Sequence, residues 1–213
     1  MNSLKLIATA LFITILSSQA YSQLSLGGQV SYLNLFGGTG LKSFGVGVKG
    51  DYAIDDKTVL SGGLNFYLPS TLTEGAYANA FSNQTSPSQI VIDTENKISF
   101  IHLYFGGKRY FVGDYEDDFG FYGLAEIGIL LAPTKTTLEE FDESKYYSTV
   151  EEGRETLSNF TINFGAGVEK EIDFGYIFLD LKLNLPANQA NGQTVAVEIP
   201  FSASINAGVR IPL

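Results

Sequence analysis

The chain ends in an alternating stretch, Val197–Leu213, which reads V-E-I-P-F-S-A-S-I-N-A-G-V-R-I-P-L. Every odd-numbered position holds an apolar residue, and the even-numbered positions hold polar residues, glycine or proline. A period of two predicts a β-strand with one apolar face and one polar face. Strands of soluble proteins have about five or six residues. A tilted strand that crosses a bilayer needs about nine to eleven, and this stretch is long enough to do so.

The same alternation recurs along the rest of the chain. Strands are predicted over residues 24–34, 44–54, 60–68, 98–112, 119–131, 159–169, 177–185 and 197–213. Successive strands joined to their neighbours predict an all-β fold, an eight-stranded antiparallel up-and-down transmembrane β-barrel.

The predicted connections alternate in length. Short turns are expected at 55–57, at 113–118 and around 173, and longer loops at 70–96, 133–155 and 186–194. Membrane barrels have short periplasmic turns and longer extracellular loops, which gives the predicted barrel an orientation. The segment 134–155 is strongly acidic. Calcium binding is one interpretation of it, but the ordered ligand spacing of a dedicated site is missing, which favours a solvated loop.

Residues 1–22 predict a secretory signal peptide that is cleaved on export. Lys5 gives a positive start, Leu6–Leu16 is apolar, and Ser17–Ser22 consists mostly of small residues. Cleavage after Ala20 and cleavage after Ser22 both fit the pattern. The domain expected to form the barrel is therefore 23–213.

Composition excludes several classes of function. The 213-residue chain has a formal net charge of -10, whereas nucleic-acid binding needs a basic surface. It contains no cysteine, so disulfides and thiolate metal sites are excluded. No motif indicates a cofactor. The glycine-rich segment 37–43 differs from a phosphate-binding loop, because a predicted strand follows it where a helix is required.

The last residues carry a resemblance to a known family. Gly208, Ile211 and Leu213 resemble the C-terminal signal of bacterial outer-membrane β-barrels, which the barrel-assembly machinery reads. The pattern of the whole mature chain is similar to the small eight-stranded barrels of the OmpA membrane-domain and OmpX type. This resemblance implies a non-enzymatic Gram-negative surface protein without a cofactor. It also implies a monomer in outer-membrane lipid that periplasmic chaperones and the assembly machinery handle during biogenesis.

The alternation itself does not say which face points inward. In a soluble lipocalin-like barrel, the apolar face would line a ligand cavity and the polar face would meet water. The polar face of this chain holds mostly Gly, Ser, Asn and Thr with isolated charges, which favours a narrow lumen over a water-facing surface.

The charged residues of the polar face are the candidate site. They form a predicted lumen network that consists of Lys49, Asp51, Glu126, Glu169, Asp180, Lys182, Glu198 and Arg210. An eight-stranded barrel is just wide enough for side chains to fill it, and buried charges must be paired. The expected result is a polar plug and no large pore. A narrow channel for ions or small ligands is the alternative.

His102, the only histidine, is also expected in the lumen. It raises the further alternative of a lipid-modifying enzyme, because outer-membrane acyl hydrolases and transferases use His with Ser or Asp. No motif selects a nucleophile to act with it, so a structural histidine and no catalytic residue is the expectation.

Overall fold

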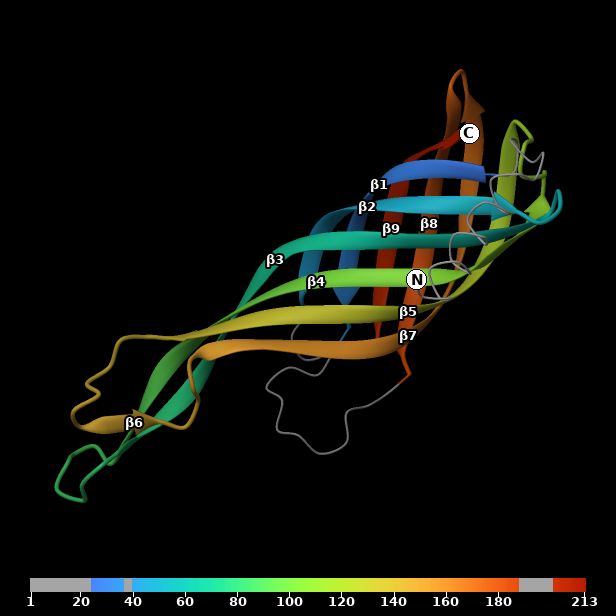
Figure 1. The fold of residues 1–213 in the computed structure, drawn as a ribbon. Helices are drawn as coiled ribbons and strands as arrows, with labels where there is room; N and C mark the ends of the chain where they lie inside the picture. Colours follow the sequence, from blue (N-terminus) through green and yellow to red (C-terminus); the bar gives the residue numbers. More distant parts are fainter. Residues whose placement is uncertain (1–23, 37–39, 188–200) are drawn as a thin grey trace, which may run out of the picture.

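The computed structural model describes residues 24–36, 40–187 and 201–213. All regular structure in this part of the chain is β-strand, as predicted (Figure 1). The strands are β1 (Leu24–Leu35), β2 (Lys42–Ala53), β3 (Thr58–Ala80), β4 (Gln89–Val112), β5 (Phe119–Leu138), β6 (Tyr146–Ser148), β7 (Gly153–Ile172), β8 (Gly175–Pro186) and β9 (Ser202–Pro212). The described residues include no helix that is long and apolar enough to cross a membrane.

Eight of these strands form a closed antiparallel ring. Its order is β1-β2-β3-β4-β5-β7-β8-β9, and β9 pairs with β1 to close it. Leu26 lies opposite Ile211 in this last pairing, and the amide of Leu213 donates a hydrogen bond to the carbonyl of Leu24. Closure leaves the barrel wall without unpaired strand edges. This matters in a lipid bilayer, where every backbone N–H and C=O group must have a hydrogen-bond partner within the protein.

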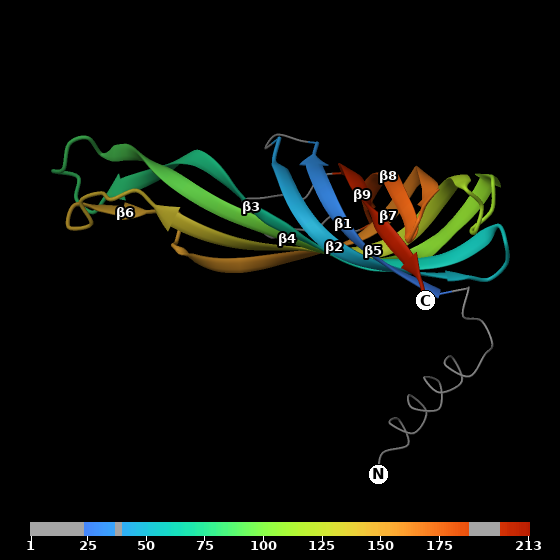
Figure 2. The same cartoon turned by 90° about the horizontal axis from the view of Figure 1, so that it is seen from above.

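Four strands continue far beyond the ring. β3, β4, β5 and β7 form a twisted sheet that projects from one end of the barrel, with the short β6 on the edge of β3 (Figures 1 and 2). The pairing of β3 with β4 runs on to Asn79 and Gln89, past a bulge between Tyr67 and Ser70. We call this extension, residues 70–98 and 134–158, the projecting sheet.

The projecting sheet corrects two loop predictions. Residues 70–96 and 133–155 were expected to be loops, but most of them are paired strands, and only 81–88 and, apart from β6, 139–152 are irregular. The physical reason is that the outer face of these strands meets water, while the inner face buries polar residues such as Thr94 and Asn96 beside a few apolar ones. Their period of two is therefore carried by Thr, Asn and Glu residues and is not visible as alternating hydrophobicity.

A small core holds the end of the projecting sheet together. Ala76, Ala78 and Ile92 pack against Tyr146 of β6, and Phe141 and Val150 of the same hairpin flank them. The turn before β6 is fixed by Asp142, whose carboxylate accepts hydrogen bonds from Ser144 and pairs with Lys145. The contacts with Lys145 and Ser144 lower the pKa of Asp142 to about 2. The acidic segment is thus largely ordered.

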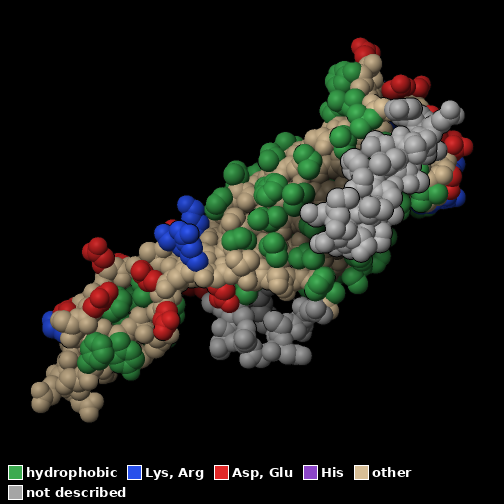
Figure 3. Space-filling model, in the orientation of Figure 1, with side chains coloured by type: hydrophobic (Ala, Val, Ile, Leu, Met, Phe, Trp, Pro, Cys, Tyr) green, Lys and Arg blue, Asp and Glu red, His purple; other side chains and the backbone are tan. Residues whose placement is uncertain are grey.

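The outer surface of the barrel is apolar. Val46, Val48, Ile127, Leu181 and Ile205 are all at least 44% exposed, and Figure 3 shows hydrophobic side chains over the visible barrel wall. Aromatic residues lie on this surface near both rims: Phe44, Phe66, Phe160 and Phe201 toward the projecting sheet, and Tyr52, Phe105, Phe119 and Phe121 toward the short turns. Because the apolar face points outward, the lipocalin-like alternative is wrong.

The final predicted strand, 197–213, is described only from residue 201 on. β9 begins at Ser202, and residues 197–200, with Glu198 among them, lie outside the described part of the chain. The predicted signal peptide, 1–22, also lies outside it, as do residues 37–39 of the glycine-rich segment.

Candidate functional site

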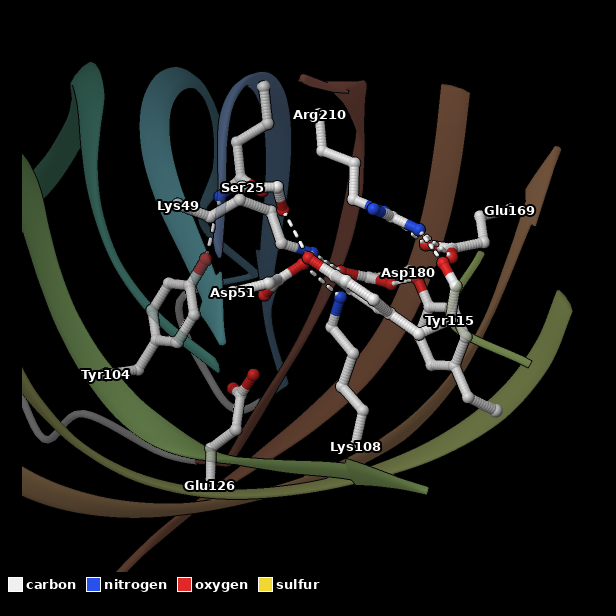
Figure 4. A network of polar contacts seen from close by, with 12 residues as sticks. Ser25, Lys49, Asp51, Tyr104, Lys108, Tyr115, Glu126, Glu169, Asp180 and Arg210 are labelled. Atoms are coloured by element: carbon white, nitrogen blue, oxygen red, sulfur yellow. Dashed lines mark hydrogen bonds and ion pairs between the residues drawn. The ribbon is translucent and has the colours of Figure 1, made fainter. Parts of the chain in front are cut away.

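The lumen contains a layer of buried ion pairs. Lys108 Nζ on β4 lies 2.6 Å from Asp51 Oδ2 on β2, and this bond passes over β3. Lys49 Nζ lies 3.2 Å from Asp180 Oδ2, which joins β2 to β8. Figure 4 shows these side chains converging from different strands on the middle of the barrel. The pairs therefore link parts of the wall that are not neighbours in the sheet.

Two further pairs complete the layer. Lys182 Nζ donates to both carboxylate oxygens of Glu126, at 2.8 and 3.0 Å. Arg210 makes a two-point contact with Glu169, with Nη2 2.6 Å from Oε1 and Nε 3.1 Å from Oε2. A parallel fork of this kind is the strongest arrangement of a guanidinium on a carboxylate. Each lumen cation in the described chain therefore has a carboxylate partner.

Seven of the predicted network residues lie in this layer, and the eighth, Glu198, is outside the described part of the chain. Lys108 was not predicted, although it has the same strand parity as His102 and Tyr104, which point inward. That parity was the available signal. Gly107 and Arg109 on either side of Lys108 obscured it, because they break the apolar set of the other face.

Aromatic side chains surround the charges. The hydroxyl groups of Tyr122 and Tyr110 donate to Asp180 and Glu169, at 2.6 and 2.7 Å. The Arg210 guanidinium lies over the rings of Tyr176 and Tyr115, at 3.7 and 4.1 Å from their centroids. Cation–π contacts of this kind stabilise a cation that has been removed from water.

A layer of uncharged polar groups lies next to the ion pairs, on the side of the projecting sheet. The Gln29 amide donates to Asn65 and to the Tyr104 hydroxyl, at 2.5 and 3.1 Å. His102 is buried here, with Nε2 3.3 Å from the Thr161 hydroxyl and 3.5 Å from the Asn163 amide. Its neighbours are thus wall side chains in the interior of the barrel, which is the geometry of a structural histidine.

Hydrophobic clusters lie toward both ends of the lumen, which the prediction of a polar plug did not include. Toward the projecting sheet, Leu33, Leu35, Ile98, Phe100 and Leu130 belong to one buried cluster. Toward the short turns, a second cluster contains Ala53, Val59, Tyr110, Tyr115, Tyr122 and Leu124. Tyr115 comes from the turn between β4 and β5, and its hydroxyl donates to Ser25, at 2.8 Å. The charges are therefore bounded by an apolar cluster toward the projecting sheet and by a tyrosine-rich cluster, which also contacts them, toward the short turns.

Inward-facing glycines make room for these large side chains. A Cβ atom on Gly167 would collide with Tyr122 and with the carboxylate of Asp180. One on Gly128 would lie 2.7 Å from His102 Nε2. Glycine at these lumen positions thus leaves space for bulky side chains on the adjacent strands.

The residues of the predicted C-terminal signal lie in β9 or directly after it. A Cβ on Gly208 would lie 2.8 Å from the ring of Phe178, which in turn lies 3.9 Å beneath the Lys49 ammonium group. Ile211 and Leu213 point outward and are about half exposed. Gly208 therefore has a packing role of its own, whether or not the assembly machinery reads it.

Comparisons with known proteins extend the fold assignment. No protein-family model and no curated protein matches this sequence. Among solved structures, Neisserial surface protein A is similar with a TM-score of 0.57 at 13% identity, over 89% of this chain and 97% of that one. A major outer membrane protein from Thermus thermophilus is similar with a TM-score of 0.55 at 8% identity, over 88% and 98%. The fold is that of bacterial outer-membrane β-barrels, and the exposed apolar wall fits a barrel that spans a membrane.

Proposed function

We propose that this protein is a surface-exposed structural barrel of the outer membrane, with a closed lumen and no large pore. In this proposal the barrel is a rigid anchor, and the projecting sheet is the part that acts outside the cell. The short turns and both chain ends then face the periplasm, as in other barrels of this kind.

The layer of ion pairs carries the proposal. Lys108–Asp51, Lys49–Asp180 and Arg210–Glu169 cross the lumen within one narrow zone. An ion that passes through would have to separate these buried pairs, and breaking a buried pair costs about 3–5 kcal/mol. The apolar cluster toward the projecting sheet adds a second barrier, because a small hydrophobic constriction excludes water and ions.

A narrow channel remains the competing proposal, and the same layer argues against it. A conducting pore keeps its charges exposed to water, often in rings of one sign. Here the lumen charges are of both signs, buried and matched one to one. The enzymatic alternative would need a base that faces lipid at a rim, whereas His102 is inside the wall.

Biogenesis belongs to the proposal as well. An export signal over residues 1–22, recognition of Gly208, Ile211 and Leu213 by the assembly machinery, and a monomeric final state are all consistent with a small anchored barrel.

Solute flux tests the proposal. The purified full-length mature chain would be reconstituted in liposomes beside an open porin at equal density, and sugar entry would be followed by osmotic swelling. We expect swelling with the porin and none above empty liposomes with this chain. Swelling comparable to that of the porin would contradict a closed lumen.

A further inference from the structure

The lysines and arginines of the described chain divide into paired and unpaired groups. Seven take part in ion pairs, in the lumen or on the surface: Lys49, Lys57, Lys108, Arg109, Lys145, Lys182 and Arg210. Lys42, Lys97, Lys135, Arg154 and Lys170 belong to none of these pairs. Lys170 lies near the short turns, but the other four share one rim of the barrel.

Three of those four form a row across adjacent strands. Lys97 on β4 lies directly opposite Lys135 on β5, and Lys135 lies directly opposite Arg154 on β7. Neighbouring strands are about 4.8 Å apart, so three cations lie side by side. All three are exposed and point outward, on the face that is apolar lower on the same strands. We call Lys97, Lys135 and Arg154 the cationic row, and Lys42 on β2 flanks it.

Such a row is unfavourable by itself, because like charges directly opposite each other on a sheet destabilise it. In the lumen, the same chain places a carboxylate beside each cation. On the cationic row it places Thr71 on one side and, two residues farther out on β4, Glu95. An external anion would relieve the repulsion.

The distance of the cationic row from the apolar wall indicates which part of a membrane would lie against it. Lys97 and Lys135 each lie four positions along their strands from an outward apolar residue, Ile101 and Leu131. Four residues span about 13 Å of strand, which is about 10 Å of height at the usual tilt of a membrane barrel. This is the level of lipid headgroups, and Lys and Arg side chains can reach down to them. Figure 3 shows basic side chains gathered where the projecting sheet leaves the apolar wall.

We propose that the cationic row binds the phosphate groups of anionic lipids in the outer leaflet. This inference rests on the proposed membrane-anchored function. Guanidinium and ammonium groups make charge-assisted hydrogen bonds with phosphate oxygens, and a row of three matches a headgroup or a pair of headgroups that carries several negative charges. Bound lipid would also fix the angle at which the projecting sheet leaves the membrane.

A single label can report which lipid lies at the cationic row, because the chain has no cysteine. Thr156→Cys places a bimane label on β7, on the outward face and two residues from Arg154. Ala203→Cys places the same label on β9, at the same rim of the barrel but away from the cationic row. The full-length mature protein would be put in nanodiscs of phosphatidylcholine with a small fraction of phosphatidic acid, with one or the other lipid brominated in its acyl chain. Quenching then measures the lipid that surrounds each label.

We expect brominated phosphatidic acid to quench the Thr156→Cys label well beyond its mole fraction, and the Ala203→Cys label only in proportion to it. The triple variant K97Q/K135Q/R154Q should lose this preference, by about fivefold in apparent affinity for each cation removed. The control variant K57Q/K145Q/K170Q has the same change in net charge at other sites and should keep the preference.

Three results would overturn the inference. Quenching by phosphatidic acid in proportion to its mole fraction at Thr156→Cys would show that the row does not select anionic lipid. An equal loss of the preference for phosphatidic acid in both triple variants would show that the preference depends only on the net charge of the protein. Displacement of the lipid by equimolar inorganic phosphate would assign the row to soluble anions.

The same experiment separates this inference from the proposed function. If brominated phosphatidylcholine quenches the Ala203→Cys label, the wall lies in lipid, and a negative result at Thr156→Cys then overturns the lipid site alone. If neither lipid quenches Ala203→Cys, the wall is not in the bilayer and both proposals are wrong.

Discussion

The ammonium nitrogen of Lys108 lies 2.6 Å from a carboxylate oxygen of Asp51, and the two side chains are 1% and 0% exposed. Lys108 is on β4 and Asp51 on β2, so their bond spans β3 inside the barrel. A buried ion pair does not always make a protein more stable than an apolar pair of similar size would. The removal of one partner, however, leaves an unpaired charge in the interior, which is strongly destabilising. For this reason, the loss of any one charged residue of the lumen network should destabilise the barrel.

Lys108→Met should therefore destabilise the barrel by about 3–5 kcal/mol, since it leaves Asp51 with only the more distant Lys49, 4.0 Å away. Lys145→Met is the matched control, because its pair with Asp142 is 62% and 45% exposed and should have little effect on stability. Urea unfolding in detergent micelles, followed by the loss of heat-modifiable mobility, measures both. In a double-mutant cycle, Asp51→Asn should recover part of the loss, whereas strictly additive effects would show that the two residues are not coupled.

Gly167→Ala should destabilise the barrel by about 1–3 kcal/mol, because the new methyl group would overlap Tyr122 and Asp180 in a filled lumen. Gly28→Ala is the control: it lies on the opposite, outward face of β1, where nothing is within 4 Å of an added Cβ. It should be neutral or stabilising by about 0.5 kcal/mol, through the loss of unfolded-state entropy. Equal effects of the two substitutions would contradict the close packing of the lumen.

Leu181→Lys and Val91→Lys test where the membrane ends. Both side chains are exposed, at 54% and 66%, but Leu181 is in the middle of β8 and Val91 is on the projecting sheet. A lysine near the bilayer midplane of a barrel costs about 2–4 kcal/mol, whereas one in water costs little. Unfolding of each variant from lipid vesicles gives the two values, and a similar cost at both positions would mean that the boundary is misplaced.

Deletion of Ile211–Leu213 should reduce the amount of barrel in the outer-membrane fraction of cells. The deletion also removes the pairing of Ile211 with Leu26 and the closing bond from Leu213 to Leu24, so lost assembly could reflect lost stability. Refolding of the truncated chain in micelles, without any assembly machinery, separates the two causes. A signal role predicts normal refolding and failed insertion in cells, whereas normal insertion in cells would contradict it.

Hydrophobic alternation was sufficient to predict the barrel wall. From Phe44 to Ala53 and from Ile177 to Leu185 the outward residues form the exposed wall and the inward residues line the lumen, so the two environments appear directly in the sequence. The signal disappears at the level where lipid ends. Thr94 and Asn96 are buried in the same strand as Ile92 and Ile98, but they look like loop residues when their neighbours on the other face are Glu95 and Lys97.

The pairing of the lumen charges could not be read from the sequence. Alternation gives the direction of Asp180 and Lys182 but not their partners, which come from β2 and β5 on other parts of the wall. Contacts across a lumen depend on strand tilt and stagger, which neighbouring residues do not encode. The inward residues Leu124 and Leu130 interrupt the polar face of β5, because each belongs to one of the two buried hydrophobic clusters.

Single-channel recording in planar bilayers tests the central claim most directly, because a closed lumen permits no ion flow. The wild-type chain should insert without stable conductance steps, while Arg210→Ala, which leaves Glu169 without its cation partner, should show small and irregular leaks. Large, steady steps from the wild-type chain would contradict a lumen closed by its own side chains.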